Sequence, residues 1–378
     1  MNWKRLLAMA RKEMIQIRRD PRSLFIALIM PVMQMGMLGY GVSLDAKHIP
    51  LYVYDQEGSQ ESQALLKRFQ ASEYFDLVKT VDNYRDLTAA VDSDRGKLAV
   101  VIPFDFSERL RDANQTNVQV IVDGADDNTA NLATDYARAV IGQYSVDFQS
   151  EWLKRQGLPV EGGGSVSIEA RTWFNEDLES RNFIIPGIVA LVMALVGALL
   201  TSLTISREWE RGTMEQLIST PITPQEVMLG KLIPYFVIGL VDAAICVAIG
   251  VWWFDVPFRG TLRSLFVTTS LFLVVILGIG FMISVAIKSQ LGASQIALLV
   301  TLLPTMMLSG FAFPIDQMPA FIRALTYVVY SRYYVTILKA IFLKGVGVQA
   351  LVAPIAALAI YAVIIGWMAT RAFKKTLD

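Results

Sequence analysis

The sequence predicts an α-helical polytopic membrane protein with six transmembrane helices and an α/β extracytoplasmic domain inserted between helices 1 and 2. Two observations predict this class: six long apolar runs, and an acidic polar stretch that separates the first run from the second. A bilayer core requires about 20 apolar residues per helix, and backbone polar groups in lipid must be satisfied within their own segment. The mean hydropathy of +0.44 agrees, and 18% of the residues are charged, against about 25% in soluble domains.

The apolar runs set the order of the transmembrane helices. They lie at residues 23–44, 183–205, 232–254, 265–287, 291–313 and 351–370. Five carry no charge, and the third carries only Asp242. An ionisable group within a membrane helix usually faces the bundle interior or water. Asp242 is therefore a candidate for a polar pathway, with a buried hydrogen bond inside the bundle as the structural alternative.

These runs and the polar stretches between them divide the chain into segments. We expect an amphipathic cytoplasmic helix at 1–22, transmembrane helix 1 at 23–44, the α/β domain at 45–181, helix 2 at 182–205, a cytoplasmic segment at 206–230, helices 3–5 at 231–313, an outer segment at 314–348, and helix 6 with a cytoplasmic tail at 349–378.

The first segment has the pattern of a helix lying at a membrane interface. Asp20 and Pro21, near its end, break the helix before the first apolar run. Its apolar residues follow helical spacing and its basic residues take the remaining face. The apolar set is Trp3, Leu6, Leu7, Ala10, Met14 and Ile17, and the basic set is Lys4, Arg5, Arg11, Lys12, Arg18 and Arg19.

The charge distribution predicts the orientation. Residues 1–22 carry seven Lys and Arg against two acidic residues, whereas residues 45–180 carry 13 against 24, a net charge of −11. Basic loops favour the cytoplasmic side, so both termini are expected inside and the acidic domain outside. One segment departs from this rule: residues 314–350, assigned outside, hold Arg323, Arg332, Lys339 and Lys344.

The outer domain alternates strand-like and helix-like patterns, which is typical of a small α/β fold. Strands are expected at 49–54, 74–81, 98–102, 118–122 and 165–173, and helices at 59–69, 84–91, 105–112 and 126–154.

Residues that could carry catalysis or bind a metal are scarce. The chain has a single histidine, His48, and a single cysteine, Cys246, and it contains no G-x-x-x-x-G-K-[ST] phosphate loop. The acidic cluster Asp123, Asp126 and Asp127 lacks the spacing of a calcium loop and is better explained as a helix N-cap. We therefore expect no catalytic residue, no metal and no cofactor bound by this chain, and no binding of nucleic acid.

The segment after the second apolar run is a dense charge cluster with apolar residues at Trp209, Met214, Leu217 and Ile218. A new helix is expected to begin at Thr223, with Pro224 in its first position and Glu226 closing a capping box. Two short helical pieces joined by a sharp turn could dock a soluble partner at the cytoplasmic surface. An ordinary solvated loop is the alternative.

Here the chain resembles the permease subunits of the ABC type-2 exporter family. These typically carry E-x-E-x-G-T-x-E-x-L followed by T-P after the second helix, matched by Glu208, Glu210, Gly212, Thr213, Glu215, Leu217, Thr220 and Pro221. A second motif, S-G-F-x-F-P-I-x-x-M-P, occurs at residues 309–319, and a third, F-L-K-G, at 342–345. The resemblance covers the whole chain and is strongest to the subgroup with a large outer domain, which includes drug-efflux permeases. Residues 329–334 depart from the family's usual N-P or I-P-L.

The resemblance implies a division of labour. A separate cytoplasmic ABC ATPase would use ATP and Mg, and two permeases, as a homodimer or a heterodimer with a paralogue, would form the pathway. Residues that would contact the ATPase are the eight motif residues together with Arg207, Trp209 and Arg211. Segment 314–348 would be re-entrant in the outer leaflet. The pathway or gate would include Asp242, Gly310, Phe311, Phe313, Pro314, Tyr330 and Tyr333.

The expected function is export of a hydrophobic or amphipathic, drug-like molecule across the inner membrane of a bacterium. Lipid, polysaccharide or a cation is an alternative cargo, and a periplasmic adaptor with an outer-membrane channel is a further possible partner. A membrane-anchored sensor or scaffold with a ligand-binding outer domain is the competing class. A secondary transporter is a third, although it calls for more intramembrane charge and paired broken helices.

Overall fold

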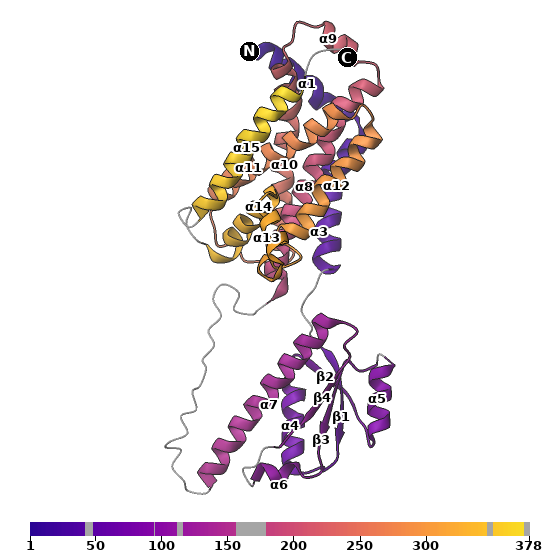
Figure 1. Cartoon of the computed structure of the whole chain (residues 1–378), viewed down its shortest axis with the longest axis vertical. Coiled ribbons are helices and arrows are strands. Elements are labelled where there is room, and N and C mark those ends of the chain that lie inside the picture. Colours follow the sequence, from indigo (N-terminus) through magenta and orange to yellow (C-terminus); the bar gives the residue numbers. More distant parts are fainter. Residues whose placement is uncertain (42–47, 94, 112–115, 156–178, 346–350, 374–378) are drawn as a thin grey trace. The chain divides into compact units, whose positions relative to one another are not determined.

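The computed structural model describes residues 1–41, 48–93, 95–111, 116–155, 179–345 and 351–373. The chain forms two compact units, one from Met1–Val42 with Thr172–Asp378 and the other from Ser43–Arg171 (Figure 1). The first unit is a bundle of helices, and the second contains a sheet with helices on both faces.

The helices of the bundle follow the chain in two groups. Before the insert come α1 (Trp3–Arg19), α2 (Pro21–Leu24), the π-helical turn η1 (Phe25–Ile29) and α3 (Met30–Gly41). After it come α8 (Ser180–Glu210), α9 (Met214–Ser219), α10 (Pro224–Trp252), α11 (Leu262–Ala286), α12 (Gln290–Leu308), η2 (Ile315–Gln317), α13 (Ala320–Thr326), α14 (Tyr330–Lys339), the π-helical η3 (Ala340–Lys344) and α15 (Val352–Ala372).

Five helices of the described residues, α8, α10, α11, α12 and α15, are long and apolar enough to cross a membrane. The helix expected at 23–44 is described only as far as Gly41, and its apolar part, Phe25–Gly41, is shorter than the other five. The structure is thus mostly helical with several apolar helices, as a polytopic membrane protein requires.

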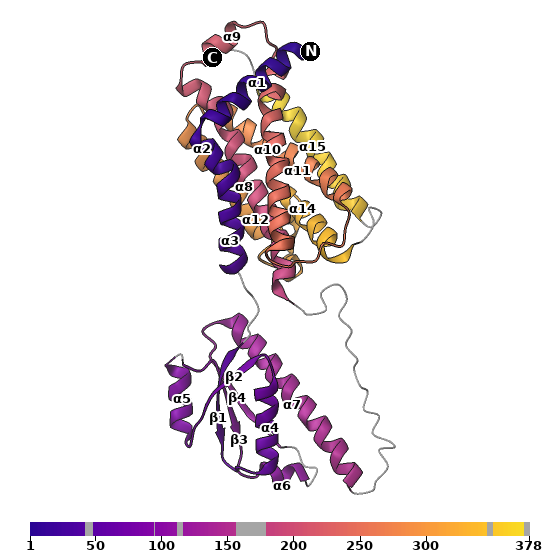
Figure 2. The ribbon, with the colours of Figure 1, turned by 180° about the vertical axis from the view of Figure 1, so that it is seen from behind.

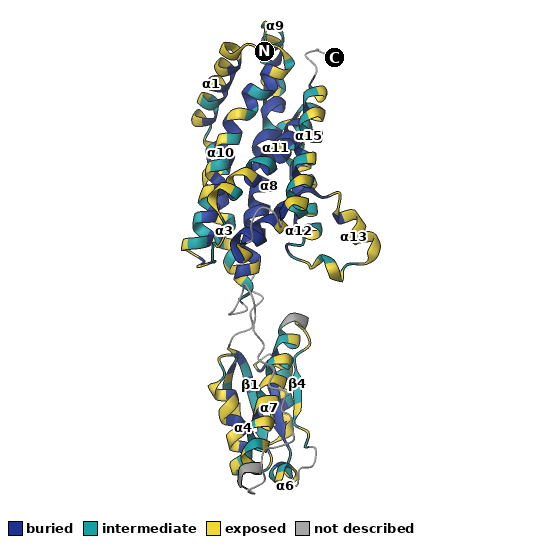
Figure 3. Ribbon diagram, turned by 90° about the vertical axis from the view of Figure 1, so that its left-hand side faces the viewer, coloured by how far each residue is buried: buried dark blue, intermediate teal, exposed yellow. Residues whose placement is uncertain are grey.

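Helix α8 lies at the centre of the bundle. It packs against α3, α10, α11, α12 and α14, and nearly every residue from Ile184 to Glu208 is buried (Figure 3). A helix that is apolar all round is expected in such an interior position. Helix α8 continues past residue 205, where the sequence predicted its end, because Arg207 and Glu208 are enclosed by neighbouring helices.

Glycines allow the central helices to approach closely. A Cβ added at Gly280 would lie 2.0 Å from Thr201 Oγ1 and 2.7 Å from the Ala198 carbonyl oxygen, both on α8. At Gly278 an added Cβ would meet Ile365 of α15 at 2.6 Å. Both glycines therefore serve the close helix packing that small residues permit in membrane bundles.

Helix α1 packs on the bundle with part of the apolar face that its spacing predicted. Leu6, Met9, Glu13 and Ile17 are buried, together with Ala10, and α1 lies along α10 (Figure 2). Trp3 and Leu7, which belong to the same apolar set, are 66% and 62% exposed. Their direction is set by the position of α10, which local spacing does not reveal.

The two ends of the bundle are built differently. Helices α1 and α9 and the C-terminal end of α15 lie together at one end, whereas α13 and α14 lie at the other (Figures 1 and 2). Segment 314–345 contains short helices and turns, and none of them is among the helices of spanning length.

The second unit contains a four-stranded sheet in the order β2-β1-β3-β4. Strand β1 (Ile49–Asp55) pairs in parallel with β2 (Phe75–Thr80) and β3 (Leu98–Ile102), and β4 (Gln119–Val122) pairs antiparallel with β3. The helices are α4 (Gln60–Ala71), α5 (Tyr84–Asp92), α6 (Phe106–Arg111) and α7 (Asp127–Arg155). These elements coincide closely with the ranges that the sequence predicted, while the strand expected at 165–173 lies outside the described residues.

Alternation along the strands gives the sheet two apolar faces. Leu51 and Val53 contribute to a core with Phe69 of α4 and Ala137 of α7, whereas Val101 on the other face packs with α5. Helices therefore cover both faces, as parallel strands require. Figure 1 shows α5 on one side of the sheet and α4 with α7 on the other.

Candidate functional site

The segment between α8 and α10 forms a sharp turn followed by the short helix α9. Gly212 has a φ of +68°, and its amide donates to the Trp209 carbonyl at 3.1 Å. A left-handed residue after a helix is usually glycine, because other residues pay a steric cost there. Met214 and Leu217 are buried and anchor α9 to the bundle. The turn is thus a fixed feature of the fold.

Helix α10 begins as the sequence predicted. Thr223 and Glu226 form both hydrogen bonds of a capping box, and Pro224 occupies the first helical position. The amide of Asn2 also donates to Glu226 Oε1 at 2.6 Å, and the Arg5 guanidinium donates to the Pro221 carbonyl. The start of α1 is therefore tied to both ends of the loop that joins α9 to α10.

The contact residues predicted from the sequence separate into an exposed group and a buried group. Glu210, Arg211, Gly212, Glu215 and Pro221 are exposed on the described surface, and Trp209, Thr213 and Thr220 are half-buried. Leu217 is buried as the anchor of α9.

Arg207 and Glu208 require a correction, because they are only 4% and 3% exposed. Their side chains point into the bundle, where they form ion pairs with other helices of the same chain. They cannot form the surface that a partner touches directly.

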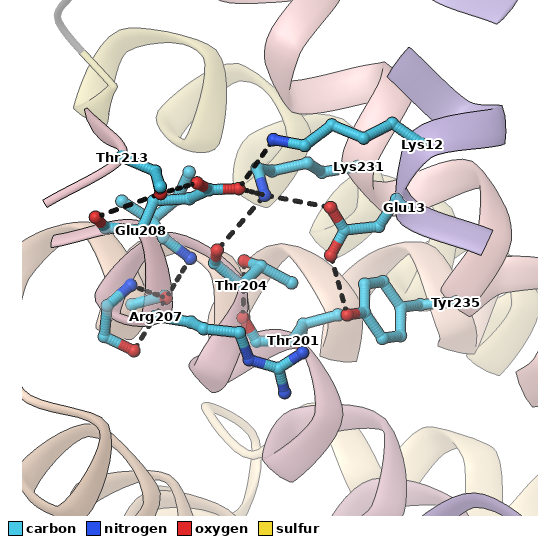
Figure 4. A network of polar contacts seen from close by, with 12 residues as sticks. Lys12, Glu13, Thr201, Thr204, Arg207, Glu208, Thr213, Lys231 and Tyr235 are labelled. Carbon is cyan, nitrogen blue, oxygen red and sulfur yellow. Dashed lines mark hydrogen bonds and ion pairs between the residues drawn. The ribbon is translucent and has the colours of Figure 1, made fainter. Parts of the chain in front are cut away.

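Lys231 of α10 is the centre of a buried charge network (Figure 4). Its Nζ lies 2.9 Å from Glu13 Oε2 on α1 and 3.0 Å from Glu208 Oε1 on α8. It also donates to the Thr204 carbonyl at 3.2 Å. Three donor directions of the ammonium group are thus matched by three oxygens, which is the arrangement that lets a charge remain in the interior.

The two carboxylates of this network are held on their remaining sides. Tyr235 donates its hydroxyl to Glu13 Oε1 at 2.9 Å, and Thr213 donates to Glu208 Oε2. Lys12, whose side chain is 51% exposed, reaches Glu208 Oε1 at 3.2 Å from the solvent side. The network therefore joins α1, α8 and α10 directly to Thr213, the residue that precedes α9.

A second ion pair continues the connection to the first apolar helix. Arg207 Nη2 lies 3.1 Å from Asp20 Oδ2 and donates to Ser23 Oγ at 3.0 Å. On the other side of the turn, Glu210 accepts from the Gln290 amide at 2.7 Å at the start of α12. The α9 turn is thus linked through polar contacts to the ends of α8, α10 and α12 and to the start of α2.

A cavity of about 390 Å³ lies between α1 and α9. Met9 and Lys12 line it from α1, and Gln216 and Leu217 line it from α9. Its mixed apolar and polar lining, beside the exposed residues of α9, gives this surface a recess that a protein side chain or helix end can enter.

Sequence reasoning missed Glu13, Lys231 and Tyr235. Glu13 carried a usable signal, because it falls one helical turn from Met9 and from Ile17 on the face that is buried. Lys231 and Tyr235 lie one turn apart on α10, but only their tertiary position reveals that they share a partner.

The predicted gate residues lie in different environments. Gly310 has a φ of +78°, and Phe311 is buried against Gly187 of α8, where an added Cβ would meet its ring at 2.2 Å. Phe313 and Pro314 are exposed. The structure therefore gives Phe311 a packing role and leaves Phe313 and Pro314 on the surface.

The two predicted gate tyrosines also differ. Tyr330 is 7% exposed, with its ring 6.0 Å from that of Phe272 on α11, so it is enclosed within its own bundle and unavailable to a partner. Tyr333 is half-buried, donates its hydroxyl to the Tyr327 carbonyl at 2.8 Å, and lies beside Tyr361 of α15.

Asp242 is 1% exposed, and neither of its carboxylate oxygens has a hydrogen-bond partner among the described residues. The alternative of a hydrogen bond inside the bundle is therefore not observed. Burying a carboxylate without a hydrogen-bond partner costs free energy. Packing alone therefore does not explain why an acidic residue occupies position 242.

Among the described residues no group of three or more potential ligands is placed to hold a metal ion. Asp123 forms an ion pair with Lys97 at 2.7 Å, and His48 lies on the surface 3.2 Å from Asp76.

The fold and this site define a polytopic membrane protein whose α9 surface is anchored to its helices by buried charges. The chain belongs to the ABC-2 family transporter proteins, whose family model matches residues 22–371. It is 40% identical to the probable multidrug ABC transporter permease YbhS of Escherichia coli (strain K12) over 351 residues, which are 91% of this chain and 90% of that protein.

Two other relatives align over similar lengths. The chain is 28% identical to the probable multidrug ABC transporter permease YbhR of Escherichia coli (strain K12), over 90% of both chains. It is 21% identical to the linearmycin resistance permease protein LnrN of Bacillus subtilis (strain 168), over 85% of this chain and 87% of that protein.

Proposed function

We propose that this chain is the transmembrane permease subunit of an ATP-driven exporter and that a separate cytoplasmic ATPase supplies the energy. Family membership supports the transport role, and the sequence contains no phosphate-binding loop of its own. Two permeases, identical or paralogous, assemble with the ATPase. The two multidrug permeases of Escherichia coli are relatives of this chain, which supports a paralogous pair as readily as a homodimer.

The observation that carries the proposal is the attachment of α9 to the bundle. The exposed residues of α9 and its turn, Glu210, Arg211 and Glu215, offer charges to a soluble partner. Directly behind them, Glu208 accepts from Thr213 and pairs with Lys231. A partner that moves α9 would therefore also displace α8 and α10, because the Thr213–Glu208 and Glu208–Lys231 contacts connect these elements directly.

The proposed topology has six spans, with the shorter helix Phe25–Gly41 as the first. The basic residues of α1 support a cytoplasmic position for α1 and α9, and the negative charge of the unit Ser43–Arg171 supports a position outside. Segment 314–345 lies at the bundle end opposite α9, and its short helices suit a re-entrant element of the outer leaflet. The membrane is the inner membrane of a bacterium, and the outer unit is where a periplasmic adaptor docks.

The proposed cargo is a hydrophobic or amphipathic drug-like molecule. The names of YbhS and YbhR describe them as probable multidrug permeases, and LnrN is named for linearmycin resistance. Asp242 and the turn at Gly310 are proposed to line the pathway and its outer gate. Asp242 is placed there because its carboxylate has no hydrogen-bond partner among the described residues.

The test is transport by a purified complex. The chain is reconstituted in vesicles with the ATPase that co-purifies with it from its native membrane, and a panel of fluorescent amphipathic dyes is supplied on the ATPase side. ATP-dependent movement of a dye, abolished when the ATPase cannot hydrolyse ATP, is expected. Failure of any ATPase to co-purify, with no dye moved, would favour the sensor class.

A further inference from the structure

A cavity of about 710 Å³ is lined by residues that include Arg332 and Lys339 of α14. Figure 1 shows α14 at the end of the bundle opposite α9. The walls of the cavity come from the start of α8, the turn after α12, helices α14 and η3, and the start of α15. All of these segments belong to the helical unit. The cavity is distinct from the recess beside α9, and its lining includes Gly310 and Pro314 of the proposed outer gate.

Lys339 reaches into this region and has no acidic partner among the described residues. Its Nζ lies 3.1 Å from the centre of the Phe183 ring and donates to the Gly310 carbonyl at 2.7 Å. No carboxylate of the described residues forms an ion pair with it, and its side chain is partly buried. A partly buried ammonium group that meets only a carbonyl and an aromatic ring retains unused capacity for an anion.

Arg332 adds a second cation to the same lining. Its guanidinium lies 3.9 Å from the centre of the Tyr327 ring and donates to the Thr326 hydroxyl, and both partners are uncharged. Lys344 also lines the cavity, whereas Asp316 is the single acidic residue of the described lining. The described lining is therefore electropositive, and two of its cations are positioned by neutral neighbours.

The rest of the lining is apolar. Ile315, Val335 and Leu343 contribute aliphatic surface beside Phe183. A small inorganic anion would leave this surface uncovered, whereas an amphiphile would place its acyl part there and its charged group against Lys339 and Arg332. Arginine and lysine are the residues that most readily bind phosphate.

The basic residues of the cavity lining are also among those that depart from the rule that basic loops lie on the cytoplasmic side. Residues 314–350 hold four Lys and Arg on the side assigned outside, where basic residues are normally disfavoured. Two of them, Arg332 and Lys339, line one cavity, and Lys344 lines it as well. Binding of an anion in this cavity would account for these three charges, whereas the membrane orientation does not account for them.

We propose that this cavity binds the phosphate headgroup of an anionic phospholipid, with Lys339 and Arg332 as the headgroup ligands. Ile315, Val335 and Leu343 contact the apolar part of the lipid. The inference does not rest on the transport function, because binding is measured on the permease alone.

The test measures lipid binding to the full chain purified in an uncharged detergent. Dihexanoyl-phosphatidylglycerol, dihexanoyl-phosphatidylcholine and inorganic phosphate are titrated separately, and bound lipid is counted by native mass spectrometry. The double variant Arg332→Gln/Lys339→Gln is compared with Arg323→Gln, which removes an exposed charge of α13 that does not line the cavity. We expect phosphatidylglycerol to bind at least tenfold more weakly to the double variant and within twofold of wild type to Arg323→Gln.

A second variant tests the proposal independently, in case the double variant does not fold. Thr336 lines the cavity and is exposed, so Thr336→Glu adds a repelling charge at its mouth and is expected to weaken phosphatidylglycerol binding while the melting temperature without lipid stays unchanged. Equal binding of the two lipids, or equal phosphatidylglycerol binding to wild type, the double variant and Thr336→Glu, would overturn the proposal. Phosphate binding as tight as phosphatidylglycerol would overturn the lipid assignment in favour of a free anion.

Discussion

Lys231 of α10 and Glu13 of α1 form an ion pair of 2.9 Å in which the two side chains are 0% and 1% exposed. The pair fixes an amphipathic helix onto the start of a long apolar helix. Close packing accompanies it, since a Cβ added at Gly230 would lie 2.7 Å from Met9 Cβ. The N-terminal helix is thus a structural part of the bundle end that carries α9.

Removing the central lysine should destabilise the bundle strongly. Lys231→Met leaves Glu13 and Glu208 buried without their shared cation, and we expect a loss of about 3–5 kcal/mol in the free energy of unfolding. Lys12→Met is the matched control, because its half-exposed contact with Glu208 should contribute about 0–1 kcal/mol. The measurement is unfolding of the detergent-purified chain in sodium dodecyl sulfate.

The triple variant Glu13→Gln/Glu208→Gln/Lys231→Met separates lost charge pairing from lost packing. It should recover much of the stability lost in Lys231→Met, because no unpaired buried charge remains. Equal losses in Lys231→Met and Lys12→Met would contradict the assigned role of the network.

The turn before α9 should depend on a left-handed residue. Gly212 has a φ of +68° and open space around its Cβ position, so substitution acts through backbone strain of about 1–2 kcal/mol. Gly212→Val is expected to reduce ATP-driven export severalfold, while Gly212→Asn, which tolerates this conformation, retains most of it. Export is compared at equal membrane levels of the protein. Identical export by both variants would show that coupling does not depend on the left-handed conformation at Gly212.

Close packing of α8 and α11 should depend on Gly280. In Gly280→Ala the new Cβ collides with the Ala198 backbone of α8, and we expect the melting temperature to fall with a loss of about 1–3 kcal/mol. Gly36→Ala is the control, because an added Cβ at Gly36 meets nothing within 4 Å. A similar melting temperature for both variants would show that the helices can separate at no cost.

The orientation can be tested with single cysteines in a Cys246→Ala background. Asp82→Cys in the α/β unit and Arg323→Cys in α13 should react in intact cells with a membrane-impermeant thiol reagent, after permeabilisation of any outer membrane. Glu215→Cys in α9 should react only after lysis. All three positions are exposed, so accessibility reports the side of the membrane. The reverse pattern would invert the topology, and labelling of Arg323→Cys only after lysis would mean that segment 314–345 lies inside.

The elements of the α/β unit could be predicted from the sequence because their signals are local. Alternation at Leu51 and Val53, and the cap at Ser59, define β1 and the start of α4 without reference to distant residues. The apolar runs revealed the long helices for the same reason. The π-helical turn at Phe25–Ile29 was not visible, because it is a feature of the folded backbone with no distinct residue pattern.

The buried network could be predicted only in part, because it depends on contacts between residues far apart in the chain. Arg207 and Glu208 looked like surface charges, and their burial follows from Asp20, Lys231 and the central position of α8. The charge at Glu215 can be predicted from the sequence to be exposed. The contacts that anchor α9, such as Thr213 with Glu208, can be identified only from the folded structure.

The proposed energy coupling requires that the α9 surface contacts a soluble ATPase. A photo-reactive amino acid replacing the exposed Glu215 should cross-link the chain to an ATPase subunit in native membranes, and the same amino acid replacing the exposed Asp82 of the α/β unit should not. Cross-linking at Glu215 with none at Asp82 is the predicted result. Absence of an ATPase cross-link at Glu215 in a variant that still exports its cargo would contradict the account.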